Sequence, residues 1–150
     1  VHDSAPQKAI AEFAPHEDRG EEYRRFLAAS VKIRVSGGSG SGTICYYDPI
    51  SNYAYVISCG HLWSGTKTVV ELQQKPVTAK VIVWYHNSQK LPKEKEYEAQ
   101  VLFWSNDRGY DASLLKFKPD WQPDFFPIAP LDYPIKPGML FNSVGCDGGR

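Results

Sequence analysis

The stretch GSGTICYYDPISNYAYVISCGH, residues 40–61, decides the fold of this chain. Two runs rich in aromatic and branched apolar residues flank a short segment, Asp48–Asn52, that carries proline, serine and asparagine. This pattern predicts a β-hairpin with its turn near residue 50. The second run ends at Ser58 and is followed by Cys59-Gly60-His61, so the histidine lies just past a buried strand. Such a rigid position suits a general base.

Two short motifs lie at predicted strand boundaries. The first is Gly40-Ser41-Gly42-Thr43 together with Tyr55-Val56-Ile57-Ser58-Cys59-Gly60-His61, and the second is Tyr110-Asp111-Ala112-Ser113-Leu114-Leu115. Together they resemble the first barrel of trypsin-like serine proteases, in the bacterial variety with a Gly-Ser-Gly strand start that is similar to HtrA proteases. The histidine precedes the aspartate by 50 residues, an order and spacing that fit this family. The resemblance runs from Val31 to Gly145.

This resemblance implies an all-β fold, with the N-terminal six-stranded β-barrel of a two-barrel trypsin-like fold, a short N-terminal helix and the first strand of the second barrel. It implies that His61 is the general base and that Asp111 orients it. The family's third motif, Gly-(Asp/Asn)-Ser-Gly-Gly, does not occur in the sequence. Ser39 and Ser41 belong to the strand start and are not interpreted as nucleophiles. We therefore expect the catalytic serine outside this chain.

The first functional hypothesis is the N-terminal part of a serine endopeptidase that is inactive alone. Its partners would be a C-terminal protease segment carrying the serine and a protein or peptide substrate. The final Arg150 suggests proteolytic processing, because a trypsin-like cut there would leave a two-chain enzyme. The alternative is that no cleavage occurs at Arg150 and the given sequence simply stops there. The competing hypotheses are a catalytically inactive protease-like barrel that acts as a binding module, and an unrelated barrel with accidental motif matches.

Composition narrows the classes of partner. The 150 residues include 17 Lys and Arg and 17 Asp and Glu, so the net charge near zero argues against nucleic acid as a partner. No apolar run reaches the roughly 20 residues of a membrane helix. The histidines at 2, 16, 61 and 86 lack the short spacings of a zinc site, and no cofactor is expected. The chain begins with Val1, so either a leader was removed or this is a boundary; we expect a secreted or periplasmic protein.

Three cysteines cannot all pair within the chain. A hairpin turn near residue 50 places Tyr55 opposite Cys45, so a bridge between Cys45 and Cys59 would need an irregular register, and free buried thiols are predicted. Cys59 precedes His61 by two residues, which suggests a cysteine nucleophile. It is instead interpreted as a small core residue on the wrong side of the base. Cys146 follows the last predicted strand.

The chain divides into an N-terminal extension and helix at 1–30, a first β-barrel at 31–118, a proline-rich inter-barrel segment at 119–137 and an incomplete second barrel at 138–150. The helix is predicted from His16 to Ala29 or Ser30 and should pack on the outside of the barrel. Besides the hairpin, strands are predicted at 31–35, 68–72, 79–85, 97–104 and 112–117, with loops at 37–42, 86–95 and 105–109. Asp107 is the competing carboxylate, but it lies in a polar turn without an apolar run behind it.

Overall fold

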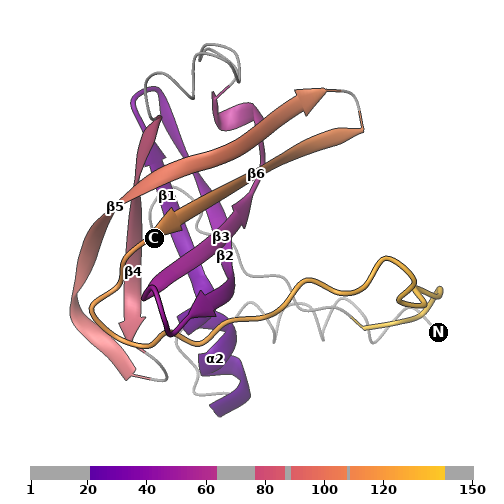
Figure 1. Cartoon of the computed structure of the whole chain (residues 1–150). Coiled ribbons are helices and arrows are strands. Elements are labelled where there is room, and N and C mark those ends of the chain that lie inside the picture. Colours follow the sequence, from indigo (N-terminus) through magenta and orange to yellow (C-terminus); the bar gives the residue numbers. More distant parts are fainter. Residues whose placement is uncertain (1–20, 64–76, 87–88, 108, 141–150) are drawn as a thin grey trace, which may run out of the picture.

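A computed structural model describes residues 21–63, 77–86, 89–107 and 109–140. Six antiparallel strands form a closed barrel in the order β1-β2-β3-β6-β5-β4, in which β4 pairs with β1 (Figure 1). The elements are α2 (Glu21–Ala29), β1 (Ser30–Val35), β2 (Gly38–Asp48), β3 (Tyr53–Ser58), the 3₁₀ turn η1 (His61–Trp63), β4 (Thr78–His86), β5 (Gln89–Asp107) and β6 (Tyr110–Phe117). The predicted all-β class and six-stranded barrel are confirmed. The strand predicted at 68–72 lies outside the described residues.

The barrel interior is filled by alternate residues of its strands. Along β6, for example, Ser113, Leu115 and Phe117 are buried while the residues between them are only half-buried. The neighbouring strand β3 contributes Ala54 and Val56, which are fully buried. Burial of each large apolar side chain stabilises the fold by about 1.5–3 kcal/mol. The alternation predicted from the sequence therefore corresponds to one packed core, to which β1, β2, β4 and β5 contribute as well.

The hairpin at the centre of the sequence forms as predicted, with one irregularity. Asp48 accepts hydrogen bonds from the backbone N–H of Ile50 and the hydroxyl of Ser51, which closes the turn. A β-bulge lies between Ile44 and Tyr46, so Tyr46 rather than Cys45 pairs with Tyr55. The Cys45 thiol donates instead to the carbonyl of Tyr55, at 3.5 Å.

Three predicted loops are shorter than expected. The glycine-serine run is mostly strand, because β2 begins at Gly38 and pairs with β1. The polar loop expected at 86–95 is largely part of β5, in which Leu91 and Tyr97 pack against the core. Most of its charged residues are exposed: Lys90, Lys93, Glu94, Glu96 and Glu98. Packing of the side chains on one face therefore stabilises this strand, although its charged residues have a low propensity for β-structure. The turn expected at 105–109 is also tighter, since β5 extends to Asp107 and β6 starts at Tyr110.

Helix α2 packs against the barrel, as predicted. Its last residues, Ala28 and Ala29, are buried. The Phe26 ring stacks on Phe126 with centroids 4.8 Å apart, which joins the helix to the segment after β6. The Ser30 hydroxyl donates to the Phe26 carbonyl at 2.7 Å and so satisfies one of the free carbonyls at the helix end. The described residues contain no helix that is both long and apolar enough to cross a membrane.

The segment from Lys118 to Leu140 contains no helix or strand. Its first part is attached to the barrel: Trp121 stacks on His86 at 4.1 Å, and the Phe126 N–H donates to the Ile44 carbonyl at 3.0 Å. Beyond this point the segment leaves the barrel as an extended arm (Figure 1). Gly138, Met139 and Leu140 are not in a strand. The rest of the strand predicted at 138–150 lies outside the described residues.

Asp120 anchors the first part of this segment through its carboxylate. The Lys95 ammonium forms an ion pair with it, and the Tyr97 hydroxyl donates to Oδ1 at 2.6 Å. These bonds, that of Lys95 first, lower the pKa of Asp120 to about 2. Burial is the main reason that the pKa of Tyr97 rises to about 12, and its bond to Asp120 contributes.

We therefore expect the Asp120 carboxyl to titrate near pH 2 in an NMR titration. Because this pKa is lower than in the unfolded chain, the ion pair stabilises the fold above about pH 4 and its contribution disappears as the pH falls toward 2. Lys95→Met should move the midpoint up toward the ordinary value of about 3.9. Lys118→Met, which removes a cation that contacts Tyr53 instead, should move it much less. A midpoint unchanged by Lys95→Met would contradict this assignment.

Candidate active site

The chain carries His61 out of the barrel on a short, rigid turn. Strand β3 ends at Ser58, and η1 begins at His61 with its backbone held by a bond from the Trp63 N–H to the Gly60 carbonyl at 3.1 Å. The Trp63 side chain is 2% exposed and belongs to the barrel core. The core therefore fixes the position of the turn, while the His61 side chain remains 64% exposed.

Asp111 lies near the start of β6, two residues before that strand pairs with β3. Its Oδ1 accepts hydrogen bonds from the backbone N–H of Gly60 at 2.6 Å and of His61 at 2.8 Å. Its Oδ2 lies 2.7 Å from Nδ1 of the His61 ring. One carboxylate thus holds both the backbone and the side chain of the histidine.

These contacts determine the charge of the carboxylate. The bond from the His61 ring is the largest cause that lowers the pKa of Asp111, and the N–H groups of His61 and Gly60 lower it further. Asp111 is therefore ionised at neutral pH, and its Oδ2 accepts a hydrogen bond from the Nδ1–H of His61. With the proton on Nδ1, the neutral imidazole presents Nε2 as a proton acceptor. This is the arrangement that a general base requires.

Gly60 permits the histidine turn to lie close against the backbone of β5 and β6. A Cβ on Gly60 would lie 1.7 Å from the carbonyl oxygen of Ser105 and 2.8 Å from that of Ala112. Any side chain would therefore push the histidine turn away from the start of β6. The sequence indicated a small residue before His61, but not this steric reason for it.

Two serines, neither of them predicted from the sequence, complete the support of the turn. Ser113, which is 2% exposed, donates from its hydroxyl to the Cys59 carbonyl at 2.7 Å. The Ser58 hydroxyl donates to the Ser41 carbonyl at 2.6 Å. Neither serine stands out in the sequence, because serine is common both in strands and in turns. The only available signal was that Ser113 lies two residues after Asp111 at an inward-facing strand position.

Cys59 differs from its prediction. The sequence predicts a core residue on the wrong side of the base, but Cys59 is only half-buried, and its Sγ lies 3.8 Å from Nε2 of His61. Since Asp111 contacts Nδ1, the thiol is on the opposite side of the ring, where a nucleophile would stand. The prediction failed because residues 59 and 61 follow the strand in a turn, where strand alternation no longer applies. Cys45 and Cys59 are both free thiols, but the predicted burial is confirmed only for Cys45.

The other candidate residues lie elsewhere. Ser39 and Ser41 are in β2, paired with Arg34 and Lys32 of β1. Asp107 ends β5 and pairs with Tyr110. Within the part of the chain that the structure describes, no three His, Cys, Asp or Glu side chains are grouped to hold a metal ion.

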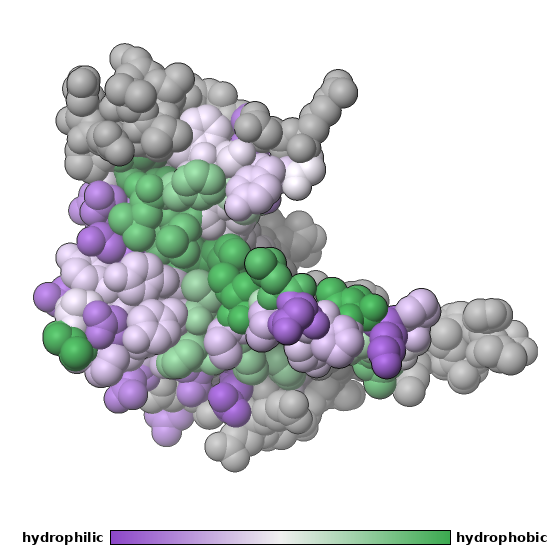
Figure 2. All heavy atoms as spheres, turned by 45° about the vertical axis from the view of Figure 1, so that its right-hand side comes forward, coloured by the Kyte–Doolittle hydropathy of each residue, from purple (hydrophilic) through white to green (hydrophobic). Residues whose placement is uncertain are grey.

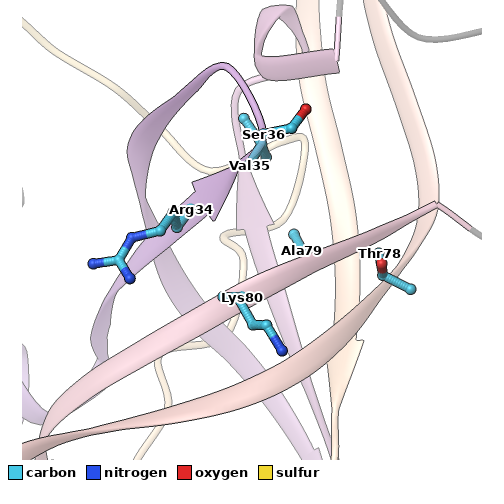
Figure 3. A pocket seen from close by; sticks show the side chains of 6 residues that line it. All are labelled: Arg34, Val35, Ser36, Thr78, Ala79 and Lys80. Atoms are coloured by element: carbon cyan, nitrogen blue, oxygen red, sulfur yellow. The ribbon is translucent and has the colours of Figure 1, made fainter.

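A shallow pocket of about 270 Å³ lies between β1 and β4 and shares no residue with the His61–Asp111 pair. Its lining includes Arg34 and Lys80, whose charged ends point in different directions (Figure 3). Arg34 is also paired with Glu96 at 2.8 Å. Because its polar groups do not converge, this pocket lacks the features of a built ligand site.

A scan against protein-family models finds none that matches the chain. A search among curated proteins also finds no significant match. The function must therefore be argued from the site itself.

Proposed function

We propose that this chain supplies the general base, His61, and the orienting carboxylate, Asp111, of a serine endopeptidase of the trypsin-like class, and that the serine lies outside residues 1–150. The observation that carries the proposal is the 2.7 Å contact between His61 Nδ1 and Asp111 Oδ2, with the second carboxylate oxygen held by two backbone N–H groups. Pairs held in this way orient an imidazole so that Nε2 accepts a proton.

In the proposed mechanism, Nε2 of His61 takes the hydroxyl proton as the serine attacks the peptide carbonyl. The Asp111 carboxylate stabilises the imidazolium that forms, and His61 then returns the proton to the leaving amine. Asp111 need not gain a proton in this cycle, consistent with its lowered pKa. The oxyanion donors would come from the same segment that brings the serine.

Exposed hydrophobic side chains on the hairpin that carries Asp111, and on the arm after β6, support packing against a further segment. Phe103 and Tyr110 lie on the β5–β6 hairpin that also carries Asp111, and they are 42% and 62% exposed. The arm after β6 exposes Ile128, Leu131, Ile135 and Leu140. Figure 2, turned so that the right-hand side of Figure 1 comes forward, shows hydrophobic (green) surface over the middle of the molecule and along the arm. Apolar surface of this kind usually marks a place where another protein segment packs.

A serine-directed phosphonate probe tests the proposal when it is combined with intact-mass analysis of the natural protein under denaturing conditions. We expect one label, on a serine outside residues 1–150, carried either by a second polypeptide or by a continuation of this one. His61→Ala should abolish labelling, because the hydroxyl would lose its base. A single unlabelled chain consisting of residues 1–150 would refute the proposal and favour a binding module.

A further inference from the structure

We propose that Cys59 is a reactive thiol that His61 activates, and that hydroperoxides modify it. The proposal rests on geometry: Sγ of Cys59 lies 3.8 Å from Nε2 of His61, whose Nδ1 contacts Asp111 at 2.7 Å. Nucleophile, base and orienting acid therefore follow one another across a single imidazole ring. This order is the signature of an activated nucleophile.

Two hydrogen bonds hold the backbone next to the thiol. The Cys59 carbonyl accepts a bond from the buried hydroxyl of Ser113 at 2.7 Å, and the Gly60 N–H is bound to Asp111 at 2.6 Å. The Cys59–Gly60 peptide unit cannot rotate without breaking these bonds, so the Cα that carries the thiol keeps its place beside His61. The side chain is half-buried, so a small reagent can reach the sulfur.

Cys45 provides the contrast within the same molecule. Its side chain is buried and donates to the Tyr55 carbonyl at 3.5 Å. Burial raises the pKa of the Cys45 thiol, which keeps it protonated and unreactive. The two free thiols of the described barrel thus differ in access and in the presence of a base.

The reaction would proceed as a two-electron transfer. Nε2 of His61 accepts the thiol proton while the sulfur attacks one oxygen of the hydroperoxide, so an S–O bond forms and the O–O bond breaks. The departing alkoxide or hydroxide takes the proton from His61 and leaves as an alcohol or water. Cys59 becomes a sulfenic acid; the sulfur is oxidised by two electrons and the peroxide is reduced by two.

The consequence for the active site rests on the proposed function. An oxygen added to Sγ would lie in the space between Cys59 and Nε2, where its hydroxyl can donate to the ring nitrogen. This hydrogen bond would occupy the lone pair of Nε2, which must accept the proton of the serine hydroxyl during catalysis. Oxidation would therefore block the general base, and reduction by a thiol would restore it.

The test treats the natural protein with hydrogen peroxide in the presence of dimedone, which traps sulfenic acids, and locates the adducts by peptide mapping. We expect adducts at Cys59 and none at Cys45. His61→Gln should slow adduct formation at Cys59 by about a hundredfold or more, the scale of general-base catalysis. Equal rates at Cys59 in the wild type and in His61→Gln would overturn the proposal.

A second measurement guards against a variant that fails to fold. In the wild type, Cys59 should form the adduct faster in the native protein than in protein unfolded by denaturant, whereas Cys45 should show the reverse. Slower reaction of native Cys59 would also overturn the inference. The phosphonate probe separates the two proposals: peroxide should prevent serine labelling in the wild type but not in Cys59→Ala. Adducts at Cys59 without any labelled serine would reject the protease and retain the reactive thiol.

Discussion

Gly60→Ala is expected to lower the free energy of unfolding by about 3 kcal/mol or more, because the added methyl has no room. Its Cβ would lie 1.7 Å from the Ser105 carbonyl oxygen, which belongs to the backbone of β5 and cannot rotate away. Relief requires that the histidine turn move away from β5 and β6. That movement breaks the two bonds from the turn to Asp111 and removes the His61 ring from its carboxylate.

Urea unfolding followed by circular dichroism measures this change. Gly38→Ala is the matched control, since a Cβ there has nothing within 4 Å and the stability should change by less than about 0.5 kcal/mol. If Gly60→Ala were as stable as Gly38→Ala, the close approach of the turn to β5 and β6 would be wrong.

Under the proposed function, Asp111→Asn is expected to reduce peptide hydrolysis about ten-thousand-fold, the scale found when a triad aspartate becomes asparagine. The amide oxygen can still accept from the N–H groups of Gly60 and His61, so the turn keeps its place. The amide nitrogen, however, would face Nδ1 as a donor. The imidazole must then carry its proton on Nε2, where it can no longer act as a base.

Asp107→Asn controls for the loss of one negative charge on the same hairpin and should leave the rate unchanged. The urea midpoint of Asp111→Asn should stay close to that of the wild type, which separates the loss of the correct tautomer from loss of the fold. Wild-type rates in Asp111→Asn would show that the His61–Asp111 pair does not carry the chemistry.

The sequence predicted the parts of this molecule that depend on local pattern. Alternating apolar residues defined most strands, and the motifs ending at His61 and beginning at Asp111 indicated the pair that the structure brings within 2.7 Å. The boundaries of β5 were wrong, because cross-strand pairing with β4 extends a charged stretch into a strand. The strand propensity of individual residues does not include the stabilisation that comes from pairing with another strand.

The rest of the site depends on contacts between residues distant in the sequence. Nothing near Gly60 shows that the Ser105 and Ala112 carbonyls will lie against it. The place of Cys59 beside Nε2 depends on how the chain turns after β3, which the pattern of β3 does not determine. The two-barrel arrangement and the cut after Arg150 stay predictions.

Closure of the barrel also affects how the protein behaves at high concentration. A strand with an open edge invites a strand of another molecule, which is the first step of amyloid-type assembly. Here β1 and β4, the two ends of the strand order, bond to each other, so the sheet formed by the described strands has no terminal strand for such growth. Self-association, where it occurs, should therefore begin at exposed side chains such as Leu131 and Leu140 on the arm, and a polar residue at those positions is the natural route to a more soluble variant.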